Sequence, residues 1–267
     1  MHCPDCAIRS QVVLVMSDIA SRISKQLQAI SDPGQSLLAR RFFKTGPGEY
    51  AEDDHFLGVS VPQIRALAKK FLSANPEDLL PLLKSRWHEE RVCCLVIWVA
   101  QSRKSRSLDE RRIIFDLYFS HLAHINNWDL VDISAPQLIG GYLLETRNSS
   151  PLGLLLKSHS LWKRRIAIVS TLAWIKSSDI SLTLRFAQDL MQDTEDLIHK
   201  ATGWMLREAG KVDEAGVLSF IETHGARMPR TMLRYAIERL DEKRRKAILL
   251  KTKTAGIVGP PPPCTIL

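Results

Sequence analysis

Apolar residues recur along most of this chain at the three- and four-residue spacing of an amphipathic helix, and hardly any stretch alternates as a strand does. In residues 61–72 this spacing is followed by Val61, Ile64, Leu67, Ala68 and Phe71. Segments rich in Gly, Pro, Asn and Ser divide these runs into lengths of about 12 to 20 residues. The sequence therefore predicts an all-α protein with no sheet.

The predicted helices also echo one another at a regular distance. A polar or charged residue opens an apolar helical run at Arg91, Asp129, Arg165, Lys200 and Arg234. The differences between these successive residue numbers are 38, 36, 35 and 34. A helical period in this range is typical of α-solenoids built from helix pairs. We therefore expect a right-handed superhelix of about six HEAT-like pairs, in which equivalent positions line one concave, basic groove.

Positive charge is concentrated in one part of the chain, whose formal net charge is +8. Residues 1–150 hold 18 Lys and Arg against 17 Asp and Glu, whereas residues 151–250 hold 17 against 12. A basic excess confined to one region favours a polyanionic partner such as nucleic acid, although many basic proteins have no such partner.

The five cysteines, at positions 3, 6, 93, 94 and 264, are too scattered for a disulfide framework, which indicates a reducing compartment. Cys3 and Cys6 have no second pair downstream, and a tetrahedral zinc site needs four ligands, so we expect no metal and no cofactor. No run reaches the length of a membrane span, and we interpret the final CTIL as a chance match to a prenylation box. A soluble monomer is expected, in the cytoplasm near the nucleoid if bacterial and in the nucleus if eukaryotic.

The segment NNWDLVDISAP, residues 126–136, places two carboxylates and a tryptophan within five residues. In a helix, Trp128 and Asp132 are four residues apart and share a face, whereas Asp129 points about a quarter turn away. A carboxylate among apolar neighbours needs a partner, an opening to solvent or a function. Two interpretations remain open on the residues alone: a buried salt bridge, for which Arg165 is a possible partner, and a catalytic carboxylate.

Five blocks of the sequence resemble the AlkD-type DNA alkylation repair enzymes, a family of DNA glycosylases made of HEAT-like repeats. They occur in the family's order, at residues 40–71, 126–140, 160–169, 197–211 and 228–240. The resemblance covers roughly residues 16–245 and implies a repeat domain at residues 16–250. Residues 1–15 form an extension outside it. The four prolines of the tail, residues 251–267, predict an extended or disordered end.

The resemblance also implies the catalytic residues. Trp128 and Asp132 match the family's Trp-x-x-x-Asp pair, in which the aspartate is catalytic, and Trp204 matches the second tryptophan of the active site. Asp129 is the nearest rival of Asp132, but its place on the helix favours a capping or supporting role.

A second set of residues is expected to bind DNA. Arg165 matches a DNA-contacting arginine of the family, with its neighbour Arg164 as the alternative. Lys200 lies in the block that carries Trp204. Phe42 falls where the family often has tyrosine, and it keeps the ring without the hydroxyl.

These assignments imply a monofunctional DNA glycosylase of base excision repair, a hydrolase that removes cationic alkylated purines from double-stranded DNA and leaves an abasic site. A carboxylate stabilises the positive charge that develops on the sugar, and tryptophan faces attract cations. Two alternatives remain: a non-catalytic HEAT-repeat protein that binds distorted or branched DNA, and a protein-interaction scaffold, which is a common use of α-solenoids.

Overall fold

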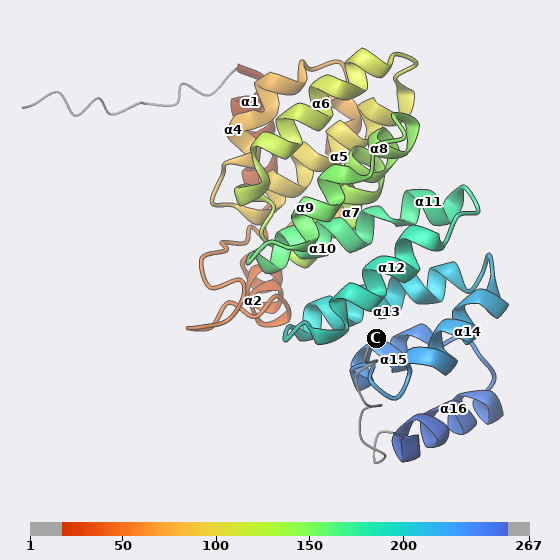
Figure 1. Ribbon diagram of the computed structural model, residues 1–267. Helices are drawn as coiled ribbons and strands as arrows, with labels where there is room; N and C mark the ends of the chain where they lie inside the picture. The colour runs from red at the N-terminus through yellow and green to blue at the C-terminus, as the bar shows by residue number, and fades with distance from the viewer. Residues whose placement is uncertain (1–17, 256–267) are drawn as a thin grey trace, which may run out of the picture. The chain divides into compact units, whose positions relative to one another are not determined.

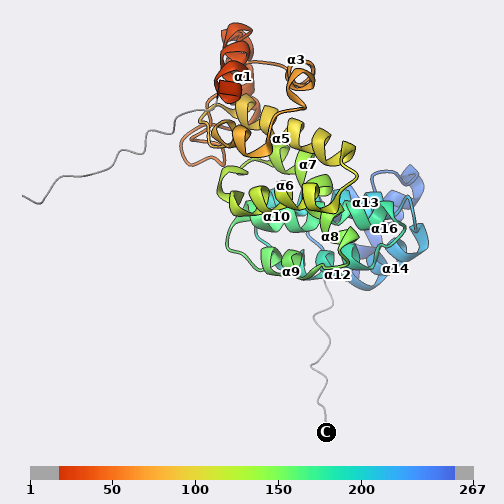
Figure 2. The ribbon, with the colours of Figure 1, turned by 90° about the horizontal axis from the view of Figure 1, so that it is seen from above.

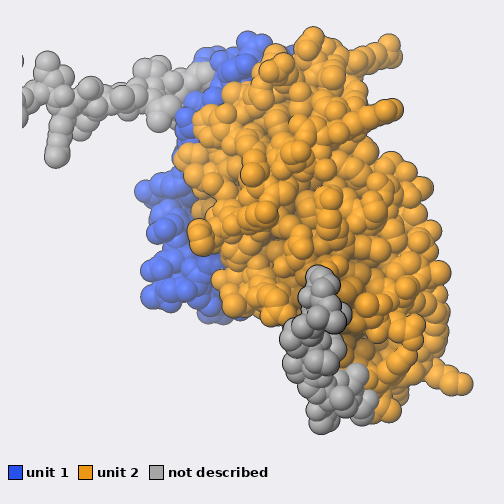
Figure 3. All heavy atoms as spheres, viewed as in Figure 1, with its two compact units in different colours: residues 1–97 blue, residues 98–267 orange. Residues whose placement is uncertain are grey.

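The computed structural model describes residues 18–255, which form two compact units that divide between Ile97 and Trp98 (Figure 3). In the described part every regular element is helical, and the only extended pairing is an isolated bridge between His55 and Trp87. The all-α prediction is therefore confirmed for these residues. Cys3, Cys6 and Cys264 lie outside the described range, as do the expected N-terminal extension and most of the tail.

Among its described residues the first unit contains four α-helices and the start of a fifth. These are α1 (Asp18–Ala29), α2 (Pro33–Phe42), α3 (Val61–Ala68), α4 (Leu80–Leu83) and α5 (His88–Lys104), with short 3-10 turns η1 (Lys69–Phe71) and η2 (Pro76–Leu79). Helix α1 buries Ala20, Ile23 and Leu27, which lie on one face because they are three and four residues apart.

Polar side chains in the first turn of α5 hold the long loop between α2 and α3. The Glu89 carboxylate accepts hydrogen bonds from the backbone N–H groups of Leu57 and Gly58, at 2.9 and 2.8 Å. In the same turn of the helix, Arg91 donates from Nη2 to Asp54 Oδ1 at 2.5 Å. This pair is sealed, because only 3% of the Asp54 side chain is exposed.

The second unit holds the rest of α5 and eleven further helices among its described residues. In order these are α6 (Leu108–Ser120), α7 (Trp128–Ala135), α8 (Tyr142–Glu145), α9 (Ser150–Leu156), α10 (Leu161–Ser170), α11 (Leu172–Lys176), α12 (Ser181–Asp189), α13 (Asp196–Ala209), α14 (Glu214–His224), α15 (Arg230–Ala236) and α16 (Glu242–Ala255). Short turns are η3 (Leu122–His124), the π-helical η4 (Pro136–Gly141) and η5 (Leu190–Gln192).

Four helices of this unit pack one after another in a row. Helix α10 contacts α7 on one side and α13 on the other, and α13 contacts α15, while α12 packs against α13 and α14 (Figures 1 and 2). The row helices begin at residues 128, 161, 196 and 230, so successive starts are 33, 35 and 34 residues apart. The last four positions of the sequence echo therefore mark the helices of this row.

Glycines allow these helices to approach closely. A side chain at Gly140 would collide with the backbone carbonyl of Ser170 in α10, and one at Gly203 would collide with the carbonyl of Met232 in α15. Each glycine thus lets one helix rest directly on the backbone of its neighbour.

Helix α16 continues to Ala255, past residue 250, where we expected the tail to begin. Trp98 and Trp174 are buried in the core, whereas Trp87 is half-buried beside the Arg86 guanidinium. None of the helices within residues 18–255 is long and apolar enough to cross a membrane.

Candidate active site

The site is built on the first two turns of α7. Asn127 precedes the helix in an extended conformation, and its buried side chain accepts a hydrogen bond from the Trp128 N–H at 2.8 Å. Trp128 is half-buried, and Asp132 lies one turn further on the same face. The Asp129 carboxylate accepts from the Leu130 N–H at 2.8 Å, within the first turn of the helix. An acidic group there also interacts favourably with the positive end of the helix dipole.

Asp132 forms a two-pronged ion pair with Arg165 of α10. Arg165 Nε donates to Oδ1 at 3.0 Å and Nη2 donates to Oδ2 at 2.8 Å. The remaining nitrogen, Nη1, donates to the Leu197 carbonyl in the first turn of α13 at 2.5 Å. One guanidinium therefore joins α7, α10 and α13, and the salt bridge that the residues alone suggested is present.

This ion pair is closed on one side and open on the other. Arg165 is buried, with 6% of its side chain exposed, whereas 19% of the Asp132 side chain reaches solvent. Each carboxylate oxygen has two lone pairs, and the bridge uses one of them on each oxygen. Asp132 therefore keeps capacity to accept a hydrogen bond from a molecule at the surface.

Burial sets the protonation of this carboxyl. Removal from water raises the pKa of Asp132 above its ordinary value, the charge of Arg165 opposes the rise, and the charge of Asp129 adds to it. Behind the site, burial also raises the pKa of Tyr118, whose hydroxyl lies 3.0 Å from Ser134 Oγ. Ser134 donates in turn to the Leu130 carbonyl at 2.5 Å, so α6 braces α7 from its buried side.

Proline lies four residues after Asp132, at position 136. Pro136 has no N–H to give to the Asp132 carbonyl, and the helix continues from it as the π-helical turn η4. Single π-helical turns occur often at functional sites. The spacing of Asp132 and Pro136 in the printed sequence was a detectable sign of this irregularity.

Arg164 is held separately from its neighbour. Its guanidinium donates from Nε and Nη2 to the Asp193 carboxylate, at 2.6 and 3.2 Å, and from Nη1 to the carbonyls of Ser158 and His159. The two arginines thus serve different connections: Arg165 reaches α7 and the start of α13, and Arg164 fixes the segments that precede α10 and α13. Asp193 and Leu197, which complete these connections, carried no sequence signal of their own.

Trp204 and Lys200 lie one turn apart on the same face of α13. Both are half-buried, and Lys200 pairs with Asp196 at 2.8 Å. Leu197, which receives the Arg165 bond, lies two turns before Trp204. The structure therefore connects Asp132, Arg165 and α13 by direct bonds, and places Trp204 further along that helix.

Phe42 belongs to the first unit, at the end of α2, and 66% of it is exposed. Its ring meets the edge of Phe43 at a centroid distance of 5.1 Å. Phe43 in turn stacks on Phe56, at 5.0 Å. The ring of Phe42 is accordingly presented to solvent while its neighbour anchors the helix end.

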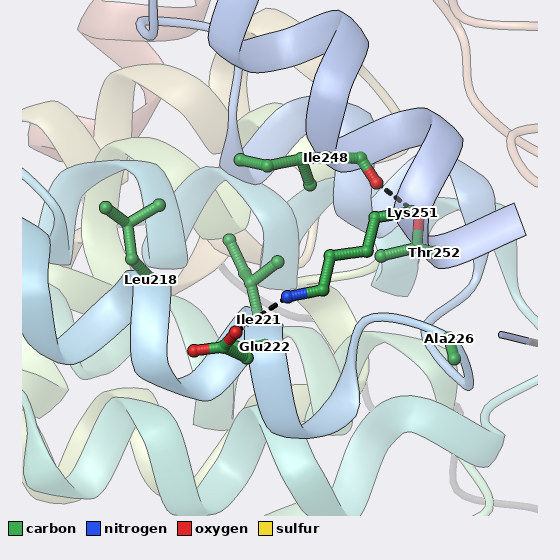
Figure 4. A pocket seen from close by; sticks show the side chains of 7 residues that line it. All are labelled: Leu218, Ile221, Glu222, Ala226, Ile248, Lys251 and Thr252. Atoms are coloured by element: carbon green, nitrogen blue, oxygen red, sulfur yellow. Dashed lines mark hydrogen bonds and ion pairs between the residues drawn. The ribbon is translucent and has the colours of Figure 1, made fainter.

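The candidate residues do not line either of the two hollows near the C-terminal helices. One, of about 220 Å³, lies between α14 and α16 (Figure 4), and the other, of about 330 Å³, lies among α13, α14 and α15. Within residues 18–255 no three metal-binding side chains come together.

Two comparisons with known proteins gave a match, one to a family and one to a solved structure. The model of the DNA alkylation repair enzyme family matches residues 23–240. The fold is similar to a solved structure described as a "predicted DNA alkylation repair enzyme from Enterococcus faecalis", with a TM-score of 0.61 at 17% identity, covering 79% of this chain and 97% of that one. The sequence has no match among curated proteins. Because the family match spans most of its length, this chain belongs to the DNA alkylation repair enzyme family.

Proposed function

We propose that this protein is a monofunctional DNA glycosylase that hydrolyses the N-glycosidic bond of cationic alkylated purines in double-stranded DNA. The substrates are bases of the 7-methylguanine and 3-methyladenine type, and the products are the free base and an abasic site. In this proposal Asp132 is the catalytic carboxylate, and Trp128 and Trp204 supply the aromatic faces of the site.

The observation that carries the proposal is the exposed edge of a carboxylate that is otherwise fixed. The two bonds from Arg165 set the orientation of Asp132, and 19% of its side chain is exposed to solvent. A charge held in place in this way stabilises a transition state without reorganising during the reaction. Trp128, one turn away on the same face, adds an aromatic surface that attracts cations.

The chemistry follows from the charge of the damaged base. Alkylation makes the purine cationic, so the bond from its nitrogen to the sugar breaks with both electrons passing to the base, which leaves as a neutral molecule. Positive charge then develops on the deoxyribose next to Asp132. A water molecule attacks the sugar carbon, and its proton passes to the carboxylate or to solvent.

We propose that the row α7, α10, α13 and α15 belongs to a series of HEAT-like repeats whose basic side binds the duplex. The regular spacing of these helices and the basic excess of residues 151–250 support this arrangement. Lys200 and Phe42 would then contact DNA directly. Arg164 and Arg165, which are bound to Asp193 and Asp132, would act on DNA by fixing the helices that carry the contacts.

The ion pair also supports a second candidate, a non-catalytic protein of the same family that binds DNA. Asp132 and Arg165 join neighbouring helices, which is reason enough for a folded protein to contain them. The two candidates differ in whether the glycosidic bond of a damaged base in the bound duplex is hydrolysed.

Release of 7-methylguanine from a methylated duplex, measured in a single turnover with excess protein, separates these functions. We expect release of the base and an unbroken strand with an abasic site. Duplex binding without release would establish the non-catalytic candidate. If the protein neither bound the duplex nor released the base, a protein-interaction scaffold would be the remaining function.

A further inference from the structure

Helix α16 begins at Glu242, after the end of the segment that matches the family model, so the family does not account for it. Its sequence, EKRRKAILLKTKTA, contains six Lys or Arg and one Glu, a balance of +5 over 14 residues. This is the most concentrated positive charge on any α-helix of the described part of the chain.

Hydrophobic packing contributes little to the contact between α16 and the rest of the unit. Thr252 is its one buried residue among those with described side chains, and Leu250 is 67% exposed. Beneath the helix lies the hollow of about 220 Å³, walled by Leu218 and Ile221 of α14 and by Ile248 of α16 (Figure 4). The hollow separates part of the apolar surface of α14 from α16, so the apolar contact between these two helices is incomplete.

Polar bonds hold α16 instead. Lys251 pairs with Glu222 at 2.7 Å beside the hollow (Figure 4), and Arg244 pairs with Glu214 at 2.7 Å. Arg230 of α15 donates to Thr252 Oγ1 at 3.0 Å. Arg244 and Lys251 are seven residues apart and therefore occupy the same side of α16, the side that faces the acids of α14.

A second row of cations runs along the outward side. Three exposed lysines, at positions 243, 246 and 253, share one side of the helix because they are three and ten residues apart. The exposed Leu250 lies on the same side. Lys246 pairs only within its own helix, with Glu242 at 2.6 Å. Neither Lys243 nor Lys253 has an ion-pair partner among the described residues. We call these three side chains the α16 lysine row.

We propose that the α16 lysine row is a binding surface for the phosphate backbone of duplex DNA, additional to the site on α7. The row is about 15 Å long at 1.5 Å per residue, and one DNA strand carries a phosphate about every 3.4 Å of axis, so the row spans about four phosphates of one strand and its three lysines can reach separate ones. The choice of DNA over other polyanions rests on the proposed function. An isologous pairing of two copies through this face would oppose lysine to lysine, which disfavours a second copy as the occupant.

The test compares two triple variants that lose the same charge. K243Q/K246Q/K253Q removes the α16 lysine row and leaves Arg244 and Lys251 in their ion pairs. K157Q/K176Q/R185Q removes three exposed cations that follow or lie on α9, α11 and α12, helices outside the row α7, α10, α13 and α15 proposed to bind the duplex, and so matches the change in net charge. Circular dichroism and thermal unfolding verify that both variants are folded.

Duplex affinity is measured over a range of salt concentrations for wild type and both variants. Loss of three phosphate contacts is expected to make the salt dependence shallower by about 2 to 3 units of log–log slope, with affinity at low salt reduced about 10-fold or more. The control variant is expected to keep the wild-type slope. Base release at saturating enzyme should be unchanged in both, because the row lies outside the reacting site.

Equal slopes for the two variants would overturn this inference while leaving the glycosylase proposal intact, provided that wild type still binds and releases the base. Binding of wild type to phosphatidylserine vesicles that requires the row, with an unchanged DNA slope, would overturn it in favour of a membrane surface. A wild type that binds no duplex would overturn both proposals.

Discussion

The two compact units each contain a buried aspartate–arginine pair that joins an arginine on one helix to an aspartate elsewhere. In the first unit, Asp54 and Arg91 expose 3% and 5% of their side chains, and in the second, Asp132 and Arg165 expose 19% and 6%. The arginines are equally enclosed. The difference lies in the aspartates, since one is shut inside the protein and the other has an open edge.

The comparison separates an ion pair that serves the fold from one that also serves a surface. Asp54 is further covered by His88, whose Nδ1 lies 3.4 Å from Oδ2, and the His88 ring stacks against Phe56 at a centroid distance of 4.8 Å. Asp132 has a half-buried tryptophan one turn away and a hydrogen-bonded tyrosine–serine pair behind its helix. Charge and pairing are alike at the two sites, so access to solvent is what distinguishes them.

The largest expected effect is on stability, at the sealed pair. Asp54→Asn leaves the Arg91 charge buried without its counter-ion, and should lower the free energy of unfolding by about 3–5 kcal/mol. Asp132→Asn should cost clearly less, because water reaches that site. Chemical denaturation of both variants checks this. Equal losses would mean that the two pairs have the same structural role.

The next effect is on chemistry, at the open pair. Asp132→Asn keeps the shape of the side chain and removes its charge, so single-turnover release of 7-methylguanine should fall by about 10²-fold or more. Duplex affinity should change little or improve, since a carboxylate near phosphates repels them. Release at the wild-type rate would contradict the catalytic role of Asp132 while leaving the fold untouched.

Proton binding sharpens the comparison further. Because burial raises the pKa of Asp132, its charge and the release rate should both be lost as the pH falls through that raised value. Folding takes up a proton at this group in the same window, so its contribution to stability declines as the pH rises. Arg165→Gln removes the charge that opposes the shift, and should move the acid limb of the pH–rate profile to higher pH. An unmoved limb would show that Asp132 does not govern the rate.

The smallest effect belongs to Asp129. Its negative charge raises the pKa of Asp132, so Asp129→Asn should move the acid limb slightly to lower pH, in the direction opposite to Arg165→Gln. The rate on the plateau should change by only a few-fold, since its carboxylate bonds to the Leu130 N–H. A loss as large as that of Asp132→Asn would instead make Asp129 the carboxylate that matters.

The sequence predicted the features that repeat or that depend on helical spacing. Apolar periodicity was enough for the all-helical fold, and the echo at Asp129, Arg165, Lys200 and Arg234 marked four helices that pack in a row. The shared face of Trp128 and Asp132 needed only the helical period. Arg165 could be named as a partner of Asp132 on chemical grounds, and the structure contains that pair.

Features that depend on which backbone atom lies opposite a side chain were not predictable. The bond from Arg165 to the Leu197 carbonyl uses a group that every residue has, so no letter of the sequence marks it. Asp193, the partner of Arg164, was one carboxylate among many. The exposed edge of Asp132 depends on packing in three dimensions, and one sequence holds no record of it.

The π-helical turn at Pro136 has a consequence for everything that follows it in the same helix. A π-helical turn holds an extra residue, and each residue of an α-helix turns the chain by about 100°. Tyr142 in α8 therefore points in a direction that an unbroken helix from Trp128 would not give it, and its ring stacks on Phe115 at 4.5 Å. Deleting one residue between Pro136 and Gly141 would rotate the Tyr142 ring away from Phe115 while leaving Asp132 in place. The direction of side chains after the π-helical turn is therefore set independently of those before it.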